Sequence, residues 1–148
     1  MRYLLLALPL LLLTLGCNKK AATAATDAPL PANLKIITFG DAESLALGTG
    51  VKVAKSDVTL EFTDVVSDNR CPKNVNCIQA GEAKVTVLLD GKPRTVILDA
   101  DNRQIASVSF TGGTFRFTGL TPYPESGQRI DPTQRRLKVE LIESARMR

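Results

Sequence analysis

The sequence reads VTLEFT at residues 58–63, where apolar side chains alternate with polar ones without a break. Because successive side chains of a β-strand point to opposite faces of its sheet, this alternation predicts a strand with one buried and one solvated face. The same period of two returns at residues 83–90, 114–118 and 137–141. We therefore expect a fold built from half-buried strands.

Turn-forming residues separate these segments, with DGKP at residues 90–93 and a Gly-Gly pair at residues 112–113. Both are typical of hairpin turns. We expect strands at residues 57–66, 80–90, 94–99, 105–110, 113–119 and 136–143. Roughly seven or eight short strands and no convincing helix favour an all-β fold, an antiparallel, immunoglobulin-like β-sandwich. A small β-barrel is the alternative, because periodicity does not distinguish the two.

The amino terminus reads MRYLLLALPLLLLTLGC, an apolar run behind one basic residue. This run fits a secretory signal, since it is shorter than the roughly 20 residues that cross a bilayer. An uncleaved membrane anchor is the alternative. The end of the run resembles the bacterial lipobox at Gly16 and Cys17, although Thr14 departs from it.

Three regions follow from this leader: a lipoprotein signal peptide at residues 1–16, a lipidated Cys17 with a flexible tether to residue 33, and one β-sandwich domain at residues 34–148. The tether is rich in Ala, Thr and Pro and lacks an apolar period. By resemblance to enteric lipoproteins, the absence of Asp directly after the lipidated cysteine, where Asn18 stands, favours the outer membrane, if the source has two membranes.

The chain has three cysteines, and assigning Cys17 to lipid leaves Cys71 and Cys77 as a pair. Export places this pair in an oxidising compartment, which favours a structural disulfide. Redox catalysis is a weaker alternative because the spacing is wider than C-x-x-C. Metal binding is weaker too, since two thiols do not complete a tetrahedral zinc site.

The composition argues against several functions. The chain has no histidine, which removes the commonest general base and metal ligand. Its formal net charge of +4 is low for a nucleic-acid binder. No G-x-S-x-G or S-x-x-K motif places a nucleophile beside a base. We therefore expect no enzyme, no metal, no cofactor and no nucleic-acid partner.

Three acids near the cysteines, Asp64, Asp68 and Glu82, allow a calcium site as an alternative. The favoured interpretation is that Asp68 caps the loop or pairs with Arg70, as short acids in turns commonly do.

The cysteine segment resembles a group of small bacterial lipoproteins of uncharacterised function. The shared residues are Asp68, Arg70, Cys71, Pro72, Cys77, Ala80 and Gly81, followed by Leu120, Pro122, Tyr123 and Pro124. Gln79 departs from the pattern, since an aromatic residue often stands there. The resemblance implies a β fold and an envelope location, and it implies no activity.

Alternating connections in a sandwich of antiparallel neighbours place the two longest loops, residues 67–79 and 120–135, at one end. We predict a stiff, basic binding surface there, formed by Arg70, Lys73, Tyr123, Arg129, Arg135 and Arg136. The alternative is that Tyr123 only packs over the edge of the core.

These features favour a membrane-anchored, non-catalytic envelope module that binds or supports a protein or glycan partner, with its oligomeric state left open. One alternative is an inhibitor of a secreted hydrolase, because a disulfide-braced loop suits that task. The other is a carboxylate-based hydrolase, because dispersed acids can converge in space.

Overall fold

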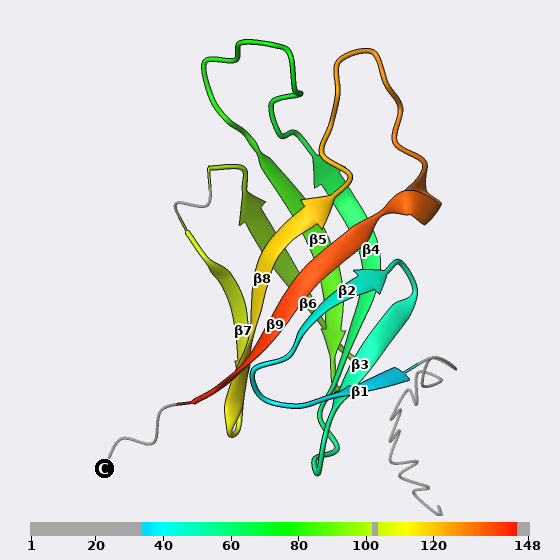
Figure 1. The fold of residues 1–148 in the computed structure, drawn as a ribbon, viewed down its shortest axis with the longest axis vertical. Coiled ribbons are helices and arrows are strands. Elements are labelled where there is room, and N and C mark those ends of the chain that lie inside the picture. The colour runs from blue at the N-terminus through cyan, green and yellow to red at the C-terminus, as the bar shows by residue number, and fades with distance from the viewer. Residues whose placement is uncertain (1–33, 102–103, 145–148) are drawn as a thin grey trace, which may run out of the picture.

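The computed structural model describes residues 34–101 and 104–144, and these form two β-sheets packed face to face (Figure 1). The predicted signal peptide, the tether and the lipidated Cys17 lie outside the described residues. Within the described residues, no helix is long and apolar enough to cross a membrane.

The first sheet has five strands in the order β1-β3-β4-β5-β6. Their bounds are β1 Leu34–Ile37, β3 Thr49–Val53, β4 Thr59–Asp68, β5 Glu82–Leu89 and β6 Lys92–Asp99. The second sheet has four strands in the order β2-β9-β8-β7. Their bounds are β2 Ala42–Ala46, β9 Arg136–Glu143, β8 Gly113–Thr121 and β7 Ala106–Phe110. A short 3₁₀ turn, Pro132–Gln134, precedes β9.

The core lies between the sheets and takes one face of each strand. Leu60 and Phe62 of β4 are fully buried, as are Phe115 of β8 and Leu141 of β9. Burying each such side chain stabilises the fold by about 1.5–3 kcal/mol. The alternation in the sequence is therefore the alternation between core and solvent.

The predicted sandwich is confirmed. The two sheets of the described residues stay separate, so the alternative of a small β-barrel is wrong. The six predicted strands correspond to β4–β9, with ends that shift by at most a few residues. The turn after β5 is confirmed as well, since Asp90 and Gly91 both have positive φ, as the favoured two-residue hairpin turn requires.

Two aspects of the fold differ from the expectation. Residues 34–53 form three short strands, and no bounds were predicted for any of them from the sequence. One of them, β1, pairs with β3 in parallel, so the sandwich is not antiparallel throughout. These segments read LKII, AESLA and TGVKV and show no sustained apolar–polar alternation, and pairing direction is a tertiary property.

The two longest connections share one end of the sandwich, as predicted. Residues 69–81 join β4 to β5, residues 122–135 join β8 to β9, and both lie at the top of Figure 1. They touch directly, because the Lys73 N–H donates to the Pro124 carbonyl at 2.9 Å. We call these two segments together the loop end.

Candidate functional site

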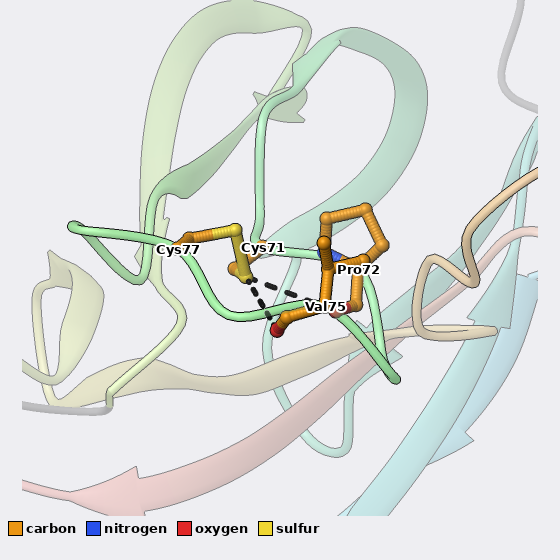
Figure 2. The surroundings of a disulfide bond; sticks show 4 residues. All are labelled: Cys71, Pro72, Val75 and Cys77. Carbon is orange, nitrogen blue, oxygen red and sulfur yellow. Dashed lines mark hydrogen bonds between the residues drawn. A yellow bond between two sulfur atoms is a disulfide. The ribbon is translucent and has the colours of Figure 1, made fainter.

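The disulfide closes a small ring within residues 69–81 of the loop end. Cys71 and Cys77 are bonded, which confirms the predicted pair. Figure 2 shows the Cys71 Sγ beside the carbonyl oxygens of Pro72 and Val75, at 3.7 and 3.6 Å. Closing so small a ring stabilises the fold by about 2–3 kcal/mol, because the disulfide lowers the conformational entropy of the unfolded chain.

The base of the same loop continues the β4–β5 ladder. The Asn69 N–H donates to Glu82 at 2.8 Å and the Cys71 N–H donates to Ala80 at 2.7 Å. Gly81 makes this close approach possible, with a φ of +75° and an Asn69 carbonyl oxygen 2.0 Å from where a Cβ would stand. No other residue fits there without moving the backbone.

Arg70 fastens the two loops together from inside. It is only 6% exposed. Its guanidinium donates to both carboxylate oxygens of Asp68, at 2.7 and 2.8 Å. It also donates to the carbonyls of Leu120 at 2.6 Å and Pro122 at 3.2 Å. A planar group with five donors suits these fixed acceptors, whereas a lysine ammonium does not.

Asp68 is the anion of this cluster and also accepts a hydrogen bond from Arg135. Burial alone raises the pKa of Asp68, but the hydrogen bonds and charges of Arg70 and Arg135 outweigh it and hold the pKa below its ordinary value of 3.8. The predicted pairing of Asp68 with Arg70 is confirmed. Because both carboxylate oxygens are engaged by guanidinium groups, Asp68 is not a calcium ligand here.

Tyr123 covers the cluster. The Arg70 guanidinium lies 4.7 Å from the centroid of its ring, a cation–π distance. Arg70 and Tyr123 therefore share one end, as predicted, but they face each other. The prediction that Arg70 lies on an exposed binding surface is wrong, and the alternative that Tyr123 packs over the edge of the core describes its place better.

The other predicted cations also form a weaker basic face than expected. Lys73 and Arg129 are exposed, and Lys73 pairs with Glu125 at 3.6 Å. Arg135 is mostly buried against Asp68. Arg136 is half-buried and donates to the Thr133 carbonyl at 2.7 Å. The guanidinium groups at this end thus mainly bind backbone carbonyls and the Asp68 carboxylate.

An apolar tip is the feature that sequence reasoning missed. The Ile78 side chain is 103% exposed, and Val75 in the same loop is 46% exposed. The signal available in the sequence was weak: these are the aliphatic residues in the otherwise polar segment 68–79. Nothing local indicated that they point outward and not into the core.

A shallow depression beside the tip carries acids. Ile78 borders it together with Glu82, Asp99 and Asp101. Glu82 pairs with Lys84 at 3.0 Å, and Asp99 accepts the Asp101 N–H at 3.1 Å. Among the residues that the structure describes, no three acids or cysteines are grouped to hold a metal ion. The carboxylate-based hydrolase stays an untested prediction.

No protein-family model, no curated protein and no solved structure matches this chain. The fold and its loop end define a disulfide-containing β-sandwich module.

Proposed function

We propose that this protein is a lipid-anchored, non-catalytic module of the bacterial envelope, which binds a partner protein through the apolar tip at Ile78 and Val75. The single observation that carries the proposal is the complete exposure of Ile78 on a braced loop. An aliphatic side chain held in water by a stiff support can serve as an anchor that enters an apolar pocket of a partner.

The stiffness of the support favours binding. The loop is held by the disulfide, by its continuation of the β4–β5 ladder and by the Arg70 cluster behind it. Little conformational entropy is then lost when the tip enters a pocket, and that loss is a main cost of association. Aliphatic tips also suit a protein pocket better than a glycan, which is recognised chiefly by aromatic and polar groups.

The anchor part of the proposal rests on the leader and on Cys17. One acyl chain gives only marginal membrane binding, so a diacylglycerol on Cys17 with an amide-linked acyl group is needed for stable anchoring. The proposed location is the envelope, at the outer membrane if the source has two membranes.

An inhibitor of a secreted hydrolase is the second candidate function. The observation in its favour is that Ile78 follows Cys77 directly, so the protruding side chain is held next to the disulfide. An inhibitor has the same braced-loop design as any other binding module, with a hydrolase as the partner.

The test is site-specific photo-crosslinking of the full chain in its native envelope. A photo-reactive residue replaces Gln79, which lies beside Ile78 and is exposed. We expect one protein adduct, which Ile78→Asp removes. Ile97→Asp is the matched control, because Ile97 is also exposed, at 49%, but lies on β6. An adduct that both variants retain, or no protein adduct at all, overturns the proposal.

The identity of the adduct separates the two candidates. A hydrolase whose activity falls on addition of the full chain, and does not fall with Ile78→Asp, supports the inhibitor. An adduct without such an effect supports the general binding module.

A further inference from the structure

The sandwich has four edge strands, β1 and β6 in one sheet and β2 and β7 in the other. An edge strand exposes a row of backbone donors and acceptors that can pair with another strand. Proteins normally discourage such pairing with charges or proline on the edge.

Three of these edges carry such protection. Strand β6 has Lys92, Pro93 and Arg94 at its start. The edges β1 and β2 are joined by an ion pair between Lys35 and Glu43. Strand β7, with the sequence ASVSF, has neither a charged residue nor a proline.

The hairpin between β7 and β8 fixes which groups of β7 point outward. Phe110 pairs with Gly113 across a two-residue turn, so this pair exchanges hydrogen bonds. In an antiparallel ladder such pairs alternate, so Val108 and Ala106 also bond to β8, while Ser107 and Ser109 turn their N–H and C=O groups outward. Both serines are exposed.

We propose that β7 pairs in antiparallel fashion with β7 of a second copy of this chain. A two-fold axis at Ser107 places Ser107 opposite its own counterpart and Val108 opposite Ala106 of the other copy. The inner-face side chains, which are only partly buried in one copy, then extend the core across the junction. Two four-stranded sheets become one continuous sheet of eight strands, four from each copy.

The charges of the edge strands favour β7 over β6 for a contact between two copies. The chain carries a formal net charge of +4, so copies repel each other on average. A pairing of two β6 edges would bring Lys92 and Arg94 together, whereas two β7 edges meet without charge. Like charges directly opposite each other in a ladder destabilise it, and β7 avoids this cost.

The test measures self-association of the full chain in detergent by sedimentation over a range of concentrations. We expect a dimer, which Ser107→Lys weakens by roughly threefold because two cations then face each other. Ser107→Pro abolishes it, since the ring removes an outward N–H that β8 does not use. Thr95→Lys on β6 is the matched control and leaves the dimer intact, because Thr95 is also exposed on an edge strand.

Circular dichroism must show that the variants keep the β fold. A chain that sediments as a monomer at every concentration overturns the proposal. A dimer that persists in a folded Ser107→Pro variant overturns it as well, because the contact then lies elsewhere. The result is independent of the Ile78 experiment. That experiment tests a different surface, the apolar tip, and a different occupant, a partner protein.

Discussion

Arg70 shows at the scale of a single residue how context decides a role. In the sequence it is one cation among several in a polar loop. In the structure it joins Asp68, the Leu120 carbonyl near the end of β8, the Pro122 carbonyl of the other long loop and the Tyr123 ring. A buried charge is tolerated only when it is paired in this way, and removing one partner of such a pair costs about 3–5 kcal/mol.

The first prediction at this scale concerns the stability that Asp68 contributes and its loss at acid pH. Because its folded pKa lies below the ordinary 3.8, Asp68 stabilises the protein fully above the unfolded pKa, and this stability is lost as the pH falls through the folded pKa. We expect Asp68→Asn to lower the free energy of unfolding by about 3 kcal/mol near pH 7. The deficit shrinks below about pH 4.

Urea unfolding of both proteins between neutral and acid pH measures this difference. Asp57→Asn is the control, because the Asp57 side chain is fully exposed and its replacement changes stability by less than about 0.5 kcal/mol. A deficit for Asp68→Asn that does not depend on pH would contradict the assignment.

At the scale of the element, the loop of residues 69–81 depends on one glycine. A Cβ on Gly81 would overlap the Asn69 carbonyl, while Gly91 has a similar φ of +72° and open space around it. Alanine substitutions at Gly81 and Gly91 therefore separate the cost of a strained backbone conformation from the cost of a steric clash with the Asn69 carbonyl.

We expect Gly91→Ala to lower stability by about 1 kcal/mol, the usual cost of a left-handed alanine. Gly81→Ala should cost at least about 2 kcal/mol more, because the backbone of the loop must move. Thermal unfolding of the two variants gives the comparison. Equal effects would mean that the loop is softer than its contacts indicate, and the support for the Ile78 tip would fail with it.

At the scale of the whole molecule, the described chain begins far from the loop end. Leu34 pairs with Gly50, which pairs with Glu61 near the start of β4, whereas the loop end lies beyond the other end of β4. Figure 1 shows β1 low on the sandwich and both long loops at the top. An anchor that precedes Leu34 would therefore be joined to the sandwich far from the tip.

The corresponding prediction is that the mature chain starts at a lipidated Cys17. Intact mass of the membrane fraction should show a chain lacking residues 1–16 and carrying acyl groups. The Cys17→Ala variant should either retain residues 1–16 or be missing from the membrane fraction, because it lacks the thiol that carries the lipid. A membrane-bound wild-type chain that keeps residues 1–16 is incompatible with the prediction.

The sequence by itself was sufficient for β4–β9, for the turn at Asp90 and Gly91, for the disulfide and for the shared end of the two long loops. Each of these follows from local information: a period of two, turn chemistry, cysteine pairing and the alternation of connections between antiparallel strands.

Only the tertiary structure decided that Arg70 is buried, that Ile78 is exposed and that β1 runs parallel to β3. The physical reason is the range of the contacts involved. Arg70 donates to Leu120, 50 residues further along the chain, and a residue's exposure depends on such distant neighbours as well as on its own side chain.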